Sequence, residues 1–576
     1  MRLRRWWPLL GIVPAFALFL AYLRMARAVT VNSDGASNAL QAWDLFHGNV
    51  LLRGWTLSDV SFFPTELIQY GLIQLVTGVT TDQIHIAAAL SWTLVVALTA
   101  WLAHTVTVTS LNTSTSAQLP PTPARTQSAT TASPAVTDTD DPDPGPSTAT
   151  ASPTAAPRRN FAATLTHGGW LAAAMAVAIV LVPAPGYSYQ TLLSSPNHTG
   201  SAVPLLITWL LIDRARDRRW LPFAVAIVLA WGAMGDPLIT FVGAAPLIVV
   251  CAYRALFARS VRGLDARLAL AGVASIIVSH GVLWLIERVG GFRAPKPPIE
   301  FSPTSAWPDR AHAVTHMIGI LFGTTRPGIQ SPWVETTLQL VRLPGLLLAI
   351  VALLLTAIAA LRGTADRVDA ILAAAIVCDL AAEIVASLPS DLMATREVVP
   401  ALPMAAVLAA RVVTRWLRTA PAAQLHTRLA VPVQSLFAVV LVVLLIALAG
   451  YAPPRAAPVE GQEAAEWLRS RGLRYGLGSY WVSNNITVGT SRNVTVVPTL
   501  SGDGRLVGMC WQTHTDMYDP AKHDARFALL EKQRPFYGTP ADVTTQYGQP
   551  VERKDFPLYV ILVYDKNLLD GFATTC

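Results

Sequence analysis

Acidic side chains follow the first apolar stretch of the chain. Residues 6–23 are almost wholly apolar, and Asp34 comes soon after them, with Asp44 further along the amphipathic segment GASNALQAWDLFHG. Asp59 and Glu66 lie in the next segment, LSDVSFFPTELIQYGLIQLV. Acids placed outside a membrane bundle, among segments that lie at the interface, can form a pocket at the level of the lipid head groups. Such a pocket would suit a substrate with a lipid tail and a polar head.

The segment that carries Glu66 also has a helical repeat. Phe63, Leu67 and Tyr70 fall at positions i, i+4 and i+7. This spacing predicts a helix lying at the membrane interface.

Basic and aromatic residues in later loops could bind the polar head of that substrate. Arg396 precedes an apolar segment, and its guanidinium offers the paired donors that suit a phosphate group. The alternative is that Arg396 only anchors a helix at the interface. The other candidates are Arg293 and Lys296 in the long loop that starts near residue 287, Tyr189 and His198 in PGYSYQTLLSSPNHTGS, and Asp236 at a helix end.

The sequence contains no strong metal-binding pattern. His312 and His316 are four residues apart, but no third ligand is near them, so we expect them to lie on the surface. The four cysteines form no CxxC motif and have no zinc-like spacing. Whether the protein holds a metal is left open by the sequence.

The composition indicates an integral membrane protein. Hydrophobic residues make up 52% of the chain and charged residues 14%, with a mean hydropathy of +0.43. A soluble chain would carry roughly a quarter charged residues. We predict a polytopic α-helical membrane protein with about eleven transmembrane helices, since each span needs about 20 apolar residues. The predicted spans are 6–23, 84–109, 166–184, 200–213, 220–235, 238–257, 268–286, 338–361, 368–388, 398–416 and 431–450.

Arginine clusters orient these spans. They follow the fourth, sixth, eighth and tenth spans and precede the first, which places them on one side if the N-terminus is cytoplasmic. Arg24 and Arg27 are exceptions. The net charge of +7 therefore indicates membrane topology, and we expect no nucleic-acid partner. Residues 1–28 also resemble a secretory signal peptide, but cleavage there would leave Asp34 on the same outer side.

Four regions are expected along the chain. Residues 1–109 hold the first spans and an outer loop at 24–83, and residues 110–160 form a disordered cytoplasmic loop rich in Ser, Thr and Pro. Residues 161–451 complete the bundle. Residues 452–576 form a small extracytoplasmic α/β domain, with strand, helix and strand across 475–500 and a buried strand in FPLYVILVYD. A disulfide between Cys510 and Cys576 would suit this location, but spacing alone does not establish it.

The chain resembles the GT-C class of membrane glycosyltransferases, which use polyprenyl-phosphate sugars. This class includes the protein O-mannosyltransferases and the aminoarabinose transferases. The likeness lies in NSDGASNALQAWDLFHGN, where Asp34 matches an acidic residue after the first span, in TREVVPALP at a late span, and in LGSYWVSNNITVGTSRNVTVVP of the C-terminal region. Two positions depart from the family pattern. Gly35 stands where the mannosyltransferases usually have Glu, and Glu397 stands where Tyr is usual.

The resemblance implies a mechanism. Asp34 would be the general base on an acceptor hydroxyl, with Asp44 as the second candidate. Arg396, with Arg293 or Lys296, would bind the lipid phosphate, and the sugar would be transferred with inversion. No cofactor is required, although a divalent cation between phosphate and carboxylate is compatible with this chemistry. The donor would be a polyprenyl-phosphate-sugar lipid, and the acceptor a protein, glycan or lipid at the plasma membrane.

Two other functions are compatible with the sequence. A lipid or solute transporter would need ionisable residues within its spans, and Asp379 and Glu383 in the ninth span are the clear ones. A non-catalytic envelope protein that binds lipid phosphate is the other alternative.

Overall fold

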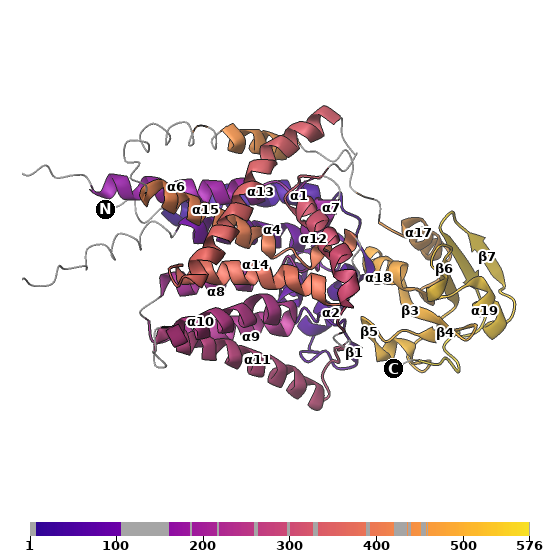
Figure 1. Ribbon diagram of the computed structural model, residues 1–576. Helices are drawn as coiled ribbons and strands as arrows, with labels where there is room; N and C mark the ends of the chain where they lie inside the picture. Colours follow the sequence, from indigo (N-terminus) through magenta and orange to yellow (C-terminus); the bar gives the residue numbers. More distant parts are fainter. Residues whose placement is uncertain are drawn as a thin grey trace, which may run out of the picture.

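The protein consists of a helical bundle with a sheet-containing unit at one end (Figure 1). The computed structural model describes residues 7–104, 161–184, 187–215, 218–257, 263–296, 300–325, 332–387, 392–419, 435, 439–450, 457 and 459–574. The predicted disordered loop at 110–160 lies outside the described residues. C-terminal residues form the unit at the end of the bundle opposite the N-terminus (Figure 1).

Each predicted apolar span corresponds to a helix. An apolar segment in lipid must satisfy its backbone hydrogen bonds internally, which favours helices here. The bundle helices are α1 (Trp7–Ala26), α4 (Asp82–His104), α6 (Phe161–Val180), α8 (Ala202–Arg214), α9 (Leu221–Gly235), π-helix η2 (Thr240–Ala244) continuing into α10 (Ala245–Phe257), α11 (Leu264–Arg288), α13 (Pro332–Leu361), α14 (Arg367–Val385) and α15 (Ala401–Thr419). Residues 439–450 are also helical.

Four helical segments in the described part of the chain are long and apolar enough to cross a membrane. They are α4, the η2–α10 segment, α11 and α13. The others are shorter or less apolar, so the total of eleven spans stays a prediction.

The long loop after α1 is folded into short elements. Helix α2 (Ser33–Phe46) begins after Asn32, whose side chain accepts a hydrogen bond from the Gly35 backbone N–H at 2.9 Å. Strand β1 (Trp55–Thr56) and helix α3 (Glu66–Thr77) follow. The helix predicted from Phe63 onward is therefore shorter than expected. Phe63 precedes Pro64, and a residue before proline is disfavoured in the helical region.

The later loops add further short helices. They are α7 (Tyr187–Leu192), the 3₁₀ helices η3 (Thr304–Ala306) and η4 (Leu392–Arg396), and α12 (Trp307–Leu321). Helix α12 carries His312 and His316, and both histidines are exposed, as expected.

The C-terminal region contains a six-stranded mixed sheet of order β4-β3-β2-β6-β8-β7. Strand β2 (Tyr475–Ser479) is parallel to both β3 (Thr495–Gly502) and β6 (Phe527–Glu531). The remaining strands are β4 (Arg505–Gly508), β7 (Glu552–Asp555) and β8 (Tyr559–Val563), and the helices are α17 (Gln462–Ser470), α18 (Tyr480–Gly489) and α19 (Pro540–Tyr547), with 3₁₀ helices η5 (Thr515–Tyr518) and η6 (Pro535–Tyr537). The predicted strand–helix–strand and the buried strand in FPLYVILVYD are confirmed.

The sheet unit packs directly on the loop after α1. The Ser33 hydroxyl donates to the Tyr480 carbonyl at 2.6 Å and accepts from Asn484 at 2.9 Å. Strand β1 also pairs with β5 (Thr513–His514), in the antiparallel sense. The contact between α2 and α18 therefore joins residues that are more than four hundred positions apart in the sequence.

Candidate active site

Asp34 lies at this contact, in the first turn of α2. Its Oδ1 accepts hydrogen bonds from the Tyr480 hydroxyl and from the Gln512 amide, the latter at 3.2 Å. No described residue donates to its other oxygen, Oδ2. The carboxylate is thus fixed through one oxygen, and the second oxygen is available to a ligand.

The surroundings make Asp34 a stronger base than an ordinary aspartate. Burial raises its pKa, and the charge of Asp59 adds to this effect. The hydrogen bond from Tyr480 and the charge of Arg396 oppose it without cancelling it. A carboxylate with a raised pKa accepts a proton more readily, which is the property a general base needs.

Arg396 ends η4, and it is positioned by the residue that follows it. Its Nε donates to Glu397 Oε1 at 3.1 Å, and its side chain is 48% exposed. Within the described part of the chain, its terminal guanidinium nitrogens have no acceptor. Those nitrogens are the donors that would meet a phosphate group.

His198 connects Glu397 to the bundle. Its Nε2 lies 2.7 Å from Glu397 Oε2 and its Nδ1 lies 2.6 Å from Asp236 Oδ2, which also accepts from Ser201. Burial alone would lower the pKa of His198, but the two carboxylates raise it well above its usual value. We therefore expect a buried imidazolium between two carboxylates, which is a satisfied arrangement for a buried charge.

The same pairing acts on Glu397. Burial would raise the pKa of Glu397, but His198 and Arg396 outweigh it and lower the pKa to about 2. Glu397 is therefore ionised at neutral pH. The guanidinium is thus held at the site by a series of hydrogen-bonded ion pairs, Asp236–His198–Glu397–Arg396, which we call the histidine-centred chain.

More carboxyl groups surround this chain. Glu66, at the start of α3, is 5% exposed and accepts from the Thr65 hydroxyl. Burial raises the pKa of Glu66 to about 7. Asp379 and Glu383, both on α14, are buried and lie close enough to Glu397 to interact with it electrostatically. These two acids are therefore part of the same cluster and do not form a separate group within the bundle.

The structure separates Asp44 from this cluster. Asp44 Oδ2 accepts from Trp55 Nε1 at 2.8 Å, near the other end of α2. This hydrogen bond connects α2 to β1 and suits a structural role.

The remaining predicted residues are Arg293, Lys296 and Tyr189. Arg293 and Lys296 are exposed, and the Arg293 backbone pairs with the segment at Trp55–Leu57. Tyr189 packs against the hydrophobic core of the bundle. Among the described residues, no hydrogen bond or ion pair joins Arg293 or Lys296 to Asp34 or Arg396. Tyr189 lies on α7, which contacts η4, the helix that ends at Arg396.

Both departures from the family pattern have a physical reason. A Cβ at Gly35 would lie 2.5 Å from the Ser195 carbonyl oxygen and 3.1 Å from Ile84, so a glutamate does not fit there. Glu397, in place of a tyrosine, is the partner of His198. Gly35 is thus explained by the close packing of α2, and Glu397 by its place in the histidine-centred chain.

Sequence reasoning missed two residues of the site, Tyr480 and Gln512. Tyr480 stands in the SYW motif that carries the family resemblance, but its contact with Asp34 depends on the α2–α18 packing. Gln512 gives no signal in the sequence. Cys510, two residues before it, is disulfide-bonded. Cys576 lies outside the described residues, so its pairing with Cys510 stays a prediction.

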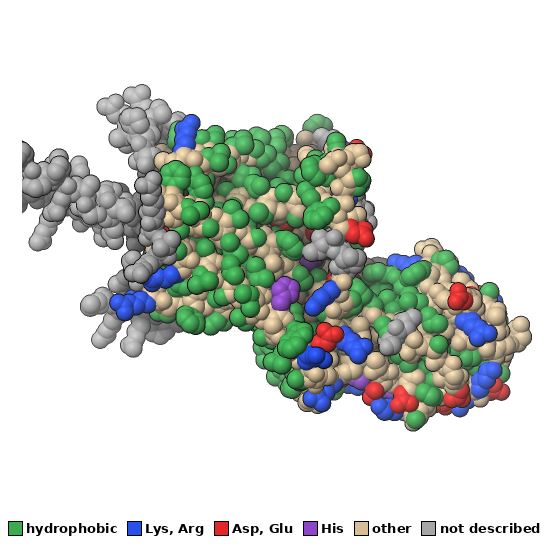
Figure 2. Space-filling model, turned by 60° about the horizontal axis from the view of Figure 1, so that its bottom comes forward, with side chains coloured by type: hydrophobic (Ala, Val, Ile, Leu, Met, Phe, Trp, Pro, Cys, Tyr) green, Lys and Arg blue, Asp and Glu red, His purple; other side chains and the backbone are tan. Residues whose placement is uncertain are grey.

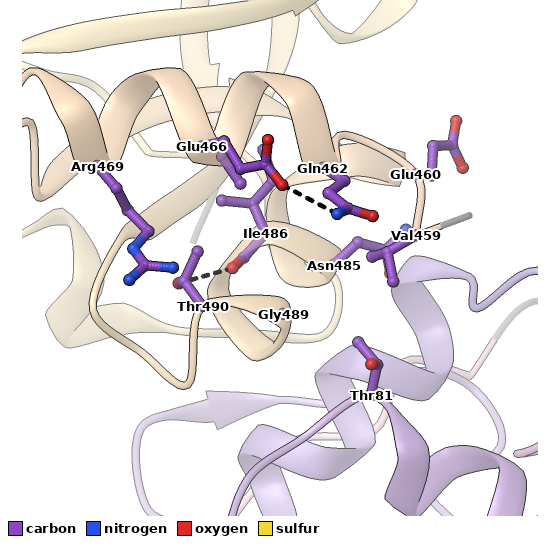
Figure 3. Close-up of a pocket in the computed structure, with 11 residues that line it drawn as sticks. Thr81, Val459, Glu460, Gln462, Glu466, Arg469, Asn485, Ile486, Gly489 and Thr490 are labelled. Carbon is purple, nitrogen blue, oxygen red and sulfur yellow. Dashed lines mark hydrogen bonds between the residues drawn. The ribbon is translucent and has the colours of Figure 1, made fainter.

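A separate pocket of about 250 Å³ lies between the sheet unit and the start of α4 (Figure 3). Thr81 faces it from one side and α17 and α18 from the other (Figure 3). Its polar lining includes Glu460, Glu466 and Arg469. It contains none of the clustered residues around Asp34, so we do not place the chemistry there.

In the ranges that the structure describes, no group of three or more His, Cys, Asp or Glu residues could hold a metal ion.

The fold of the chain is similar to that of ArnT, in agreement with the resemblance to the GT-C class predicted from the sequence. No family model and no curated protein sequence matches the chain. Two similar solved structures are of ArnT from Cupriavidus metallidurans. ArnT bound to undecaprenyl phosphate has a TM-score of 0.51 at 11% identity, covering 96% of this chain and 97% of that one. Apo ArnT has a TM-score of 0.51 at 13% identity, covering 98% and 99%.

Proposed function

We propose that this chain is a membrane glycosyltransferase that moves a sugar from a polyprenyl-phosphate donor to an acceptor hydroxyl, on the outer face of the plasma membrane and with inversion. The observation that carries the proposal is the site itself. Asp34 is hydrogen-bonded through Oδ1, and no described residue donates to its Oδ2. Arg396 is close enough to interact electrostatically with Asp34, and its terminal nitrogens have no acceptor among the described residues. ArnT, which has a similar fold, was solved with undecaprenyl phosphate bound.

The proposed reaction assigns one role to each group. Asp34 Oδ2 takes the proton of the acceptor hydroxyl, and the hydroxyl oxygen attacks the anomeric carbon on the face opposite the phosphate. The bond from that carbon to the phosphate oxygen breaks, and the lipid phosphate leaves with the electron pair. Arg396 stabilises the charge that develops on the phosphate. Glu397 and His198 position Arg396 and do not contact the reacting atoms.

The outer location rests on the distribution of charge. Hydrophobic side chains cover much of the bundle in Figure 2, and Lys and Arg side chains are visible both at the end far from the sheet unit and on and around the sheet unit. The helix ends far from the sheet unit carry Arg214, Arg254 and Arg367, which by the positive-inside rule would face the cytoplasm. The sheet unit would then be extracytoplasmic, and a disulfide at Cys510 suits that side.

The direct test is transfer itself. The purified chain is incubated with radiolabelled polyprenyl-phosphate sugars and with cell-envelope fractions. We expect label to move from at least one donor into the envelope fraction. An absence of transfer from every donor, with lipid phosphate still bound, would contradict catalysis and favour the lipid-binding alternative.

A further inference from the structure

In the sheet unit, the connections that follow two neighbouring parallel strands, β2 and β6, lead to opposite sides of the sheet. From the carboxyl end of β2 the chain passes through α18 to β3, on one side of β2. From the carboxyl end of β6 it passes through α19 to β7 and β8, on the other side. In open α/β sheets, ligands bind in the crevice outside the carboxyl ends of strands at such a point.

Aromatic side chains gather at this point. Tyr480 and Trp481 directly follow β2, and Phe536 and Tyr537 closely follow β6. Trp481 Nε1 donates to the Tyr537 hydroxyl at 3.1 Å, and the Tyr480 and Tyr537 rings lie 6.0 Å apart. We call Trp481, Phe536 and Tyr537 the aromatic platform. Phe536 is 66% exposed, and the other two are half-buried.

The platform adjoins Asp34. Tyr480, which contacts both Trp481 and Tyr537, donates its hydroxyl proton to Asp34 Oδ1. The charge of Asp34 also reaches Tyr537. A ligand on the platform would therefore lie next to the Asp34 carboxylate.

The positive charge beside the platform is neutralised by carboxylates. Arg534 lies over the Trp481 ring, with its guanidinium carbon 5.4 Å from the ring centroid. The same guanidinium is 2.6 Å from Glu531 and 3.5 Å from Glu460. Because these carboxylates neutralise Arg534, the platform favours an uncharged ligand over a phosphate or an acidic peptide.

We propose that the aromatic platform binds a neutral pyranose ring of the acceptor, and that the acceptor is therefore a glycan. The C–H groups on one face of a pyranose carry partial positive charge and pack on the negative face of an aromatic ring. The Tyr537 hydroxyl and the Arg534 N–H groups lie at the edge, where sugar hydroxyls need partners. This inference rests on the proposed function, because it takes Asp34 as the base and a hydroxyl as the nucleophile.

Binding can be tested without any donor. Saturation-transfer difference NMR is run on the full chain in detergent with mannotetraose, cellotetraose and galactotetraose, and with a Ser/Thr-rich peptide as the rival ligand. We expect saturation of ring C–H protons in at least one tetrasaccharide. Trp481→Leu should weaken that binding about tenfold, since it removes the aromatic face on which the sugar ring packs. Phe536→Ala, at an exposed position, should weaken it as well.

The chain offers a matched control. Trp467 is also half-buried and also lies under an arginine, with Arg471 5.5 Å from its ring centroid, but it is on α17. Trp467→Leu should leave tetrasaccharide binding unchanged.

The outcomes separate the two proposals. Tetrasaccharide binding that depends on Trp481, without transfer from any donor, would support the platform and contradict the glycosyltransferase. Transfer into peptide, with no tetrasaccharide bound at millimolar concentration, would overturn the platform and leave the glycosyltransferase standing. Equal loss in Trp467→Leu would also overturn it, because the effect would then be general.

Discussion

At the scale of single residues, the two oxygens of Asp34 have different surroundings. Oδ1 accepts from Tyr480 and Gln512, whereas Oδ2 accepts from no described residue. Tyr480→Phe removes one of these donors and keeps the ring. Because this hydrogen bond lowers the pKa of Asp34, its loss should move the acid limb of kcat/KM to higher pH.

The measurement is the pH dependence of kcat/KM for the acceptor. Tyr475→Phe is the matched control, since that hydroxyl donates to the Met517 carbonyl at 2.7 Å, within the sheet unit. An acid limb that stays in place in Tyr480→Phe would mean that Asp34 is not the titrating base.

Glu66 makes stability depend on pH. Its pKa rises from 4.5 to about 7 on folding because the side chain is buried. The folded state then holds the proton more tightly, so stability is lost as pH rises from about 4.5 to about 7, by up to roughly 3 kcal/mol. Glu66→Gln removes this charge and should unfold at a higher temperature than wild type at about pH 8.

Thermal unfolding in detergent at acidic and alkaline pH measures this effect. Glu463→Gln, at an exposed position of α17, should behave as wild type. A Glu66→Gln variant with the same pH dependence as wild type would contradict the burial argument.

At the scale of elements, the packing of α2 decides where Asp34 lies. A Cβ at Gly35 would meet the Ser195 carbonyl oxygen at 2.5 Å, and a backbone atom cannot move aside cheaply. Gly35→Ala should therefore cost about 1–3 kcal/mol in stability and reduce transfer by displacing the first turn of α2. Gly281→Ala on α11 is the control, because its Cβ would have no atom within 4 Å.

Unfolding midpoints and transfer rates of the two alanine variants measure this difference. We expect the stability of Gly281→Ala to match that of wild type or exceed it slightly, since alanine favours helix. If Gly35→Ala also matched wild type, the contact between α2 and the Ser195 segment would not be tight.

The elements were more predictable than their contacts. Apolar length alone located the bundle helices, and residue pattern located the strand–helix–strand of β2, α18 and β3. The start of α3 was wrong by several residues, because a repeat that included Phe63 does not account for Pro64. The position of Asp34 after the first span was enough to nominate it. Its partner Tyr480 lies 446 residues away, so only the α2–α18 packing identifies that contact.

The histidine-centred chain shows a similar limit. His198, Asp236 and Arg396 were each singled out by residue type, but three separate loops had to converge to join them. Glu397 stood out only as a departure from a family pattern. Its role follows from geometry, since both of its carboxylate oxygens are engaged.

At the scale of the whole molecule, the end of the bundle opposite the site is held by a buried ion cluster. Arg411 on α15 donates to Asp369 at 2.5 Å, to Asp366 at 3.2 Å and to Asp213 at 3.3 Å. Arg411→Leu would leave buried carboxylates without their main partner. We expect a loss of roughly 3–5 kcal/mol in stability, with KM for donor and acceptor unchanged in the folded fraction.

Arg415→Leu is the comparison, because Arg415 also binds Asp369 but its side chain is 38% exposed. It should cost less than Arg411→Leu. The unfolding midpoint and the two KM values are the measurements, and a raised KM in folded Arg411→Leu would contradict a purely structural role.

The central claim is that Asp34 is the base of a sugar transfer from a lipid phosphate. The most direct measurement compares kcat for transfer in Asp34→Asn and in Asp44→Asn, at matched folding. Both residues lie on α2, but Asp44 is hydrogen-bonded to Trp55. We predict that Asp34→Asn lowers kcat by about 10²–10⁴ and that Asp44→Asn stays within a few-fold of wild type. Transfer that persists in Asp34→Asn and disappears in Asp44→Asn would contradict the account.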